Sequence, residues 1–226
     1  MQAFLNMMQA VDAFFPVGAF TLSNGLETYV QQEVFKTSED LERYLDDYIR
    51  ILPENDMGLM YLGWQFREQK SQLLQLDWLA AAAKPAKEIR EGSQKVALRF
   101  LKAMDKMDGG LRGSLAWYYD EIRGKRADGC HPIVLGLYAG ELAMDIETAL
   151  GMYGYSILSA IVNNAVKLVP LSQMEGQKIL NRFLPKLQDA VNMAMTVTMD
   201  QIGISGCAWD IRCMQHQWLY ARLYMS

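Results

Sequence analysis

The sequence predicts an all-α fold, a single helical bundle of roughly ten helices that occupies residues 1–226 as one domain. Apolar residues recur at helical spacing along most of the chain, and capping patterns or prolines mark the ends of segments. Hydrophobic residues make up 51% of the chain, which allows a sizeable core without disulfides or a structural metal. The most β-prone run, 196–198, is too short to outweigh its helical flanks.

The first distinctive segment is FPVGAFTLSNGLETYV, at residues 15–30. Pro16 fixes φ and Gly18 tolerates a positive φ, so the segment is predicted to open with a turn. Ser23 or Asn24 is then predicted to cap a short helix.

The same segment carries no charged group between Asp12 and Glu27 and places no nucleophile beside a base. A turn that displays the aromatic ring of Phe20 suits docking to a partner better than catalysis. The alternative is an ordinary loop between two core helices.

The clearest helix is predicted at residues 41–52, where apolar residues form a stripe on one face: Leu41, Tyr44, Leu45, Tyr48, Ile49 and Leu52. Thr37 and Asp40 have the spacing of a capping box at its start. Pro53 follows its end.

Three further helices are predicted in the middle of the chain. The first is the Leu- and Ala-rich run 73–83, and Pro85 is placed in the first turn of the second. The second carries a core stripe from Ile89 to Met104 and is ended by the glycine pair at 109–110. The third is predicted at 112–123.

Two apolar helices are predicted next. Pro132 starts one that continues to about Leu150, where the glycines of 151–154 break it. Residues 155–169 form the other, which Pro170 stops.

The last part of the chain is predicted to contain two helical regions. Ser172 and Glu175 have capping-box spacing and open a region that extends to about residue 200, kinked or split at Pro185. The final helix is predicted at 210–220.

Charge and composition restrict the class of partner. The net charge of −4 argues against nucleic acid, because phosphate contacts need clustered Lys and Arg. Three cysteines, an odd count, and no signal-peptide pattern indicate a reducing cytoplasm. The most apolar stretches, 133–144 and 155–168, are interrupted before the run of about 20 apolar residues that a membrane span needs.

Motifs for nucleotide or metal chemistry are absent from the sequence: there is no Gly-x-x-x-x-Gly-Lys-Ser/Thr loop, no Gly-x-Gly-x-x-Gly, no Cys-x-x-Cys and no His-Glu-x-x-His. There are two histidines, His131 and His216. His131 precedes Pro132 at a predicted helix start and is interpreted as an ordered loop residue rather than a base. The sequence therefore predicts no catalytic residue, no resident metal and no cofactor.

One constellation supports a metal hypothesis as an alternative. Cys130 and His131 are adjacent, and Cys213 and His216 lie three apart on one face of a predicted helix, with Cys207 just before it. Cysteine and histidine together suit zinc or nickel. The competing interpretation is that these cysteines are small buried hydrophobes.

Three charged residues lie in otherwise unusual surroundings. Glu88 and Arg90 are interpreted first as a structural ion pair or cap in a helical bundle. Lys167 sits in an apolar helix, and the sequence leaves open whether it pairs internally or extends to the surface.

The C-terminal run is rich in large apolar residues and contains one arginine: Trp218, Leu219, Arg222, Leu223 and Tyr224. Chain ends usually fray, so this one either packs on its own bundle or docks on a partner. Trp, Tyr and Arg are the residues enriched at interface hot spots.

Four stretches, in order along the chain, resemble the UreF family of urease accessory proteins. The first is the segment at 15–30, with a Phe-Pro-x-Gly turn, an aromatic, a Ser and then Gly-Leu-Glu. The others are KEIREGS at 87–93, VKLVPL at 166–171 with the nearby Gln173, Gly176 and Gln177, and HQWLYARLYMS at 216–226.

This resemblance implies an all-helical, dimeric accessory protein that binds UreD (also called UreH) and recruits the GTPase UreG. The complex would deliver nickel to apo-urease, and the family has been proposed to regulate the GTPase. The implied partner-binding residues lie in the front segment and the tail: Pro16, Gly18, Phe20, Glu27, Trp218, Arg222, Leu223 and Tyr224.

On this resemblance the turn around Gly18 and Phe20 lies near the GTPase-binding surface. Arg222 matches the arginine of the family's closing Arg-Leu-aromatic-x-Ser motif, in a tail that orders on binding UreD. Gln217 stands where the family commonly has Glu, which puts any role for that acid in doubt, and Tyr224 replaces the commoner Phe.

Two other classes of function stay open at this point. One is a small helical metal-binding enzyme that uses the cysteine and histidine constellation. The other is a helical adaptor unrelated to urease.

Overall fold

The computed structural model describes residues 1–19, 22–107, 109–204 and 206–224. Its helices are α1 (Gln2–Val11), α2 (Leu26–Gln31), α3 (Ser38–Ile51), α4 (Asp56–Gln65), α5 (Lys70–Ala82), α6 (Lys87–Met107), α7 (Gly113–Arg123), α8 (His131–Glu141), α9 (Ile146–Leu168), α10 (Gln173–Ala194), the short 3-10 helix η2 (Met199–Gln201) and α11 (Cys207–His216). These ranges contain no strand, so the predicted all-α class is confirmed.

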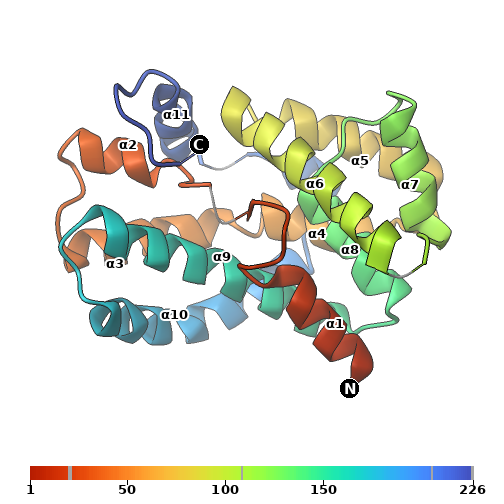
Figure 1. Cartoon of the computed structure of the whole chain (residues 1–226), viewed down its shortest axis with the longest axis horizontal. Coiled ribbons are helices and arrows are strands. Elements are labelled where there is room, and N and C mark those ends of the chain that lie inside the picture. The colour runs from red at the N-terminus through yellow and green to blue at the C-terminus, as the bar shows by residue number, and fades with distance from the viewer. Residues whose placement is uncertain (20–21, 108, 205, 225–226) are drawn as a thin grey trace.

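The helices surround a shared hydrophobic core in which α4 packs along α8, and α9 along α10 (Figure 1). Helices α5, α6, α7 and α8 gather at one end of the molecule, and α3, α9 and α10 at the other. Gly136 of α8 lies so close to α4 that a Cβ atom would collide with the carbonyl oxygen of Met60. This close approach of two backbones makes α4 and α8 the centre of the bundle.

Helix α3 starts at the predicted capping box. The Thr37 hydroxyl accepts a hydrogen bond from the Asp40 amide, and Asp40 in turn accepts one from the Thr37 amide. This capping box satisfies amide groups that the first turn of a helix leaves without partners.

The predicted boundary between α8 and α9 is wrong. The break lies at residues 142–145, where Ala143 has φ 48° and the Asp145 side chain caps α9 through the Thr148 amide. The helix then continues through Gly151 and Gly154. A Cβ atom on Gly154 would collide with Leu187 of α10, so this glycine serves close helix packing rather than ending the helix.

Three other helices also have ends that differ from the prediction. Gly25, with φ 79°, and not Ser23 or Asn24, is the N-cap of α2. Helix α10 runs unbroken through Pro185 and ends at Ala194, before the predicted residue 200. The last helix begins and ends earlier than predicted, because Gly206 in the left-handed region starts α11 at Cys207.

The start of α8 is fixed by buried polar contacts. The Asp77 carboxylate accepts hydrogen bonds from the Tyr118 hydroxyl and from the amides of Asp128 (2.7 Å) and Gly129 (3.0 Å). The Tyr118 oxygen accepts from the Cys130 amide at 3.1 Å. Because Asp77 is 1% exposed, these backbone contacts replace the water that a carboxylate would otherwise bind.

No helix in the described part of the chain combines the length and apolar character needed to cross a membrane. Helices α2 and α11 lie side by side, with the C-terminal end of the chain next to them (Figure 1). This neighbourhood brings the front segment of the sequence to its tail.

Candidate functional site

Three helices and the C-terminal tail (residues 217–224) contribute to a group of charged side chains that we call the tail cluster. It consists of Glu27 of α2, Glu88 of α6, His216 of α11 and Arg222 of the tail. The side chains of Glu27 and His216 are 1% and 0% exposed, whereas that of Arg222 is 44% exposed. The cluster therefore reaches from the interior to the surface.

His216 lies between the two carboxylates. Its Nε2 atom is 3.0 Å from Glu27 Oε2, and its Nδ1 atom is 2.7 Å from Glu88 Oε2. Each ring nitrogen thus faces a carboxylate oxygen at hydrogen-bond distance, so the ring links the two acids.

The two carboxylates also hold the tail. Glu27 Oε1 accepts from the Leu223 amide at 2.7 Å, and Glu27 Oε2 accepts from the Tyr224 amide at 3.2 Å. Arg222 Nη1 donates to Glu88 Oε1 at 2.7 Å. Hydrogen bonds to ionised groups are stronger than neutral ones, so the cluster fixes the path of the backbone at 222–224.

Local structure at the start of α2 positions Glu27. Gly25 has φ 79°, and a Cβ atom there would lie 3.2 Å from Cys213 Sγ, so α2 begins directly against α11. The Thr28 hydroxyl donates to the Arg212 carbonyl at 3.0 Å and fastens the same contact. Glu27 lies in the first turn of α2, where the helix dipole favours a carboxylate.

Although its backbone is anchored, the tail exposes large apolar side chains. The exposed fractions are 81% for Trp218 and 77% for Leu223, and Tyr220 is fully exposed. Tyr224 is partly covered, and burial, followed by the charge of Glu27, raises the pKa of its phenol. An ordered strip of exposed aromatic and aliphatic groups has the character of a docking surface.

The front segment lies next to a pocket, which Val17 and Ala19 help to line. Pro16 is exposed, Gly18 has φ 80°, and Arg99 of α6 donates to the Val17 carbonyl at 3.2 Å. Phe20 lies outside the described residues, so its docking role stays a prediction.

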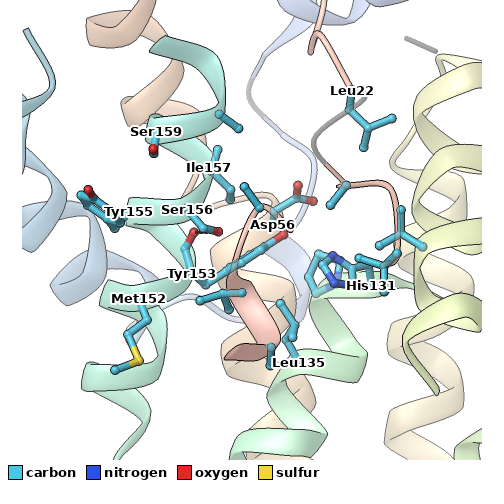
Figure 2. Close-up of a pocket in the computed structure, with 18 of the residues that line it drawn as sticks. Leu22, Asp56, His131, Leu135, Met152, Tyr153, Tyr155, Ser156, Ile157 and Ser159 are labelled. Carbon is cyan, nitrogen blue, oxygen red and sulfur yellow. Dashed lines mark hydrogen bonds between the residues drawn. The ribbon is translucent and has the colours of Figure 1, made fainter. Parts of the chain in front are cut away.

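The pocket next to this segment has a volume of about 570 Å³ and lies between α1, α8 and α9 (Figure 2). Its walls are mainly apolar. Asp56, His131 and Tyr153 face the same space in the middle of the pocket. Lys84 forms an ion pair with Asp56 at 2.6 Å.

Burial and neighbouring charges shift the pKa values of ionisable groups in and next to this pocket. Burial opposes the Lys84 ammonium, but the charge of Asp56 outweighs it and raises the pKa of Lys84. Burial lowers the pKa of His131 to about 4 and raises that of Cys130 to about 12. At neutral pH the thiol is therefore protonated and the imidazole uncharged.

The structure does not assemble the metal site of the alternative hypothesis. Cys130 packs in the main core, Cys213 packs with Ala86 and Ile89, and both ring nitrogens of His216 face carboxylates. Within the described residues, no group of three or more His, Cys, Asp or Glu side chains is arranged to hold a metal ion. Cys130 and Cys213 pack as small hydrophobic residues, as the competing interpretation expected, whereas Cys207 is exposed.

The other charged residues singled out in the sequence have structural contacts. Glu88 belongs to the tail cluster, and Arg90 donates to the carbonyl of Lys84, in the loop between α5 and α6, at 2.7 Å. Lys167 is exposed at the surface.

Sequence reasoning did not predict that Glu27, Glu88 and His216 meet. His216 lies 128 positions from Glu88 and 189 positions from Glu27, and each acid has the appearance of an ordinary first-turn residue of a helix. The one available signal is that all of them lie in the stretches of family resemblance.

Comparison with known proteins first defines the class. The chain is similar to urease accessory proteins: it is 38% identical over 223 residues to the urease accessory protein UreF of Actinobacillus pleuropneumoniae serotype 5b (strain L20), with 97% of each chain covered. It is 36% identical to that of Haemophilus influenzae (strain PittGG), covering 97% of this chain and 94% of the relative.

The particular family follows from the same findings. The sequence model of the UreF family matches residues 35–184. UreF of Bacillus sp. (strain TB-90) is 32% identical over 229 residues and covers the whole chain, front segment and tail included. The chain belongs to the UreF family of urease accessory proteins.

Proposed function

We propose that this protein is the scaffold of a nickel-delivery complex, in which it binds a UreD-type (UreH-type) accessory protein, recruits a UreG-type GTPase and helps mature apo-urease. The proposal rests on one observation, the anchored position of the C-terminal tail. Its backbone is held by Glu27 and its Arg222 side chain by Glu88, and its apolar side chains remain free to contact a partner.

In this proposal the residues have different roles. Trp218 and Leu223 are apolar anchors for the UreD-type partner, because exposed aromatic and aliphatic groups gain the most on burial. Arg222 offers its remaining N–H groups to the GTPase. Glu27 is buried and acts through the tail rather than by direct contact.

Further parts of the proposal rest on the family and the fold. Homodimerisation and regulation of GTP hydrolysis follow from the resemblance alone. The shared core, which extends from Met7 to Ile202, supports treating residues 1–226 as one domain.

A pull-down with purified UreD-type and UreG-type proteins tests the scaffold. The wild-type chain is expected to capture the first alone and the second in its presence. Deletion of residues 218–226 should abolish GTPase capture and weaken UreD-type binding by about tenfold or more, since the apolar anchors are lost.

Trp78→Ala is the matched control, because Trp78 is also an exposed tryptophan but lies on α5. It should leave both interactions unchanged. Normal assembly of the deletion variant would contradict the role of the tail.

A further inference from the structure

A second pocket, which we call the aromatic groove, lies between α3 and α11 and has a volume of about 390 Å³. Five aromatic side chains line it: Tyr29, Phe35, Tyr44, Tyr48 and Trp209. It is separate from the tail cluster, and the family resemblance assigns it no role.

The aromatic groove presents ring surfaces rather than hydrogen-bond donors. Tyr44 stacks on Tyr48 with ring centroids 5.8 Å apart and an angle of 11°. The Tyr44 hydroxyl (2.6 Å) and the Trp209 indole N–H (2.7 Å) both donate to the carbonyl of Asn24, so these donors are already used. Tyr44 and Trp209 are partly exposed, which leaves π surface open to a ligand.

Acidic groups dominate the rim. Asp40 and Asp47 both line the groove, against a single base, Arg43, which is paired with Asp40. Asp47 is exposed and makes no hydrogen bond or ion pair with any residue that the structure describes. A free carboxylate beside aromatic rings favours a cationic ligand, because ring faces carry partial negative charge.

We propose that the aromatic groove binds an arginine side chain presented by a partner protein, with the guanidinium on the aromatic rings and paired with Asp47. The rings already accept one arginine from within the chain: the guanidinium carbon of Arg212 lies 5.0 Å from the centroid of the Tyr29 ring. Tyr29 is itself part of the groove lining, so the groove offers contacts of the same chemistry to a cation.

Arginine fits these features better than lysine does. Its planar guanidinium stacks on aromatic faces and pairs with a carboxylate through two parallel hydrogen bonds, whereas an ammonium is a compact and strongly hydrated charge. The elongated aliphatic stem of arginine also covers apolar surface such as that of Ile51 in the groove lining.

The first experiment tests the groove without any partner. N-acetyl-arginine methylamide is titrated into the 15N-labelled protein, and the indole N–H signal of Trp209, assigned with Trp209→Phe, is followed. A saturable shift is expected, and the isosteric but uncharged citrulline analogue should bind about tenfold more weakly or not at all.

Asp47→Asn should weaken arginine binding by about fivefold or more, because it removes the unpaired carboxylate. Asp189→Asn, at an exposed aspartate on α10 outside the groove lining, should have no effect. An unsaturable shift, or equal binding of arginine and citrulline analogues, would overturn the proposal.

The second experiment rests on the proposed function only for its choice of partner, the purified UreD-type protein. Asp47→Lys should reduce its binding by about tenfold while Asp189→Lys leaves it unchanged. Unchanged binding with Asp47→Lys would overturn docking on this partner. A change in oligomeric mass by light scattering would show instead that a second copy supplies the arginine, which also contradicts the proposal.

A failure of the proposed function can be told apart from a failure of the arginine-binding proposal. If the wild-type chain does not bind the UreD-type protein at all, the proposed function fails, and the arginine titration still decides the chemistry of the groove.

Discussion

Two regions of this protein use buried carboxylates in different ways. At the start of α8, Asp77 accepts hydrogen bonds from backbone amides of the loop at 128–129 and from Tyr118, deep in the bundle. In the tail cluster, Glu27 and Glu88 hold the last residues of the chain.

The Asp77 contacts and the tail-cluster contacts hold different parts of the molecule. Loss of the Asp77 contacts disturbs α8, which packs against α4 at the centre of the core. Loss of the tail contacts releases the segment at 222–224, which lies at the edge of the bundle beside α2 and α11. We therefore expect the first region to control stability and the second to control binding.

The largest effect on folding is expected from Asp77→Ala. It leaves the Tyr118 hydroxyl and two amides without their acceptor, so the free energy of unfolding should fall by about 3 kcal/mol. Urea denaturation followed by circular dichroism measures this, with Asp128→Ala, an exposed acid in the same loop, as the control. A loss below about 1 kcal/mol would show that the loop does not depend on this carboxylate.

A second, pH-dependent effect is expected from His131 at the same helix start. Burial lowers its pKa in the folded state from 6.5 to about 4, so on acidification the unfolded chain binds a proton first. The contribution of His131 to stability is thus complete above about pH 6.5 and is lost as the pH falls towards 4, by up to about 3 kcal/mol.

This effect is isolated by comparing the wild type with His131→Gln in denaturation experiments between pH 7 and pH 4. The ring contacts Phe100 and Tyr153, so the variant is also less stable at neutral pH, and the slopes with pH are the quantity to compare. Equal slopes in the two proteins would contradict a buried, uncharged His131.

The smallest effect on folding, and the largest on binding, is expected from Arg222→Ala. The side chain is nearly half exposed and close to the chain end, so the free energy of unfolding should change by less than about 1 kcal/mol. Binding of the UreD-type protein should persist, whereas assembly with the GTPase and urease activation in cells should be lost. Arg222→Lys should be affected less, because it keeps the charge but not the planar fork.

Arg182→Ala is the matched control, since Arg182 also forms an exposed pair with a glutamate, Glu42, at 2.5 Å. It should leave activation unchanged. Normal urease activation by Arg222→Ala would exclude a role for this arginine. It would also contradict the expectation that the tail cluster controls binding.

Most of the fold was accessible from the sequence because its signals are local. The capping residues Thr37 and Ser172 and the apolar stripe of α3 predict helices through contacts within a few residues. The α8–α9 boundary was not accessible in this way. Gly151 and Gly154 have the appearance of helix breakers, and only the contact of Gly154 with α10 shows why a glycine is needed there.

The candidate site was accessible in part. The family resemblance singled out Glu27 and Arg222 by their place in motifs, but not their contacts. Asp77 carried no signal, because an acid within a helix is common and its partners lie 41 to 52 positions away.

The sequence by itself determined that the chain is all-α, where most helices begin and which family it resembles, because periodicity, capping and motif order depend on neighbours in the chain. Only the tertiary structure decided that His216 is buried between Glu27 and Glu88, that these acids fix the tail, and that five aromatic side chains line a groove with an acidic rim. The physical reason is that charge pairs and aromatic contacts act over a few ångströms in space, and the packing of α2 against α11 brings together residues that lie far apart in sequence.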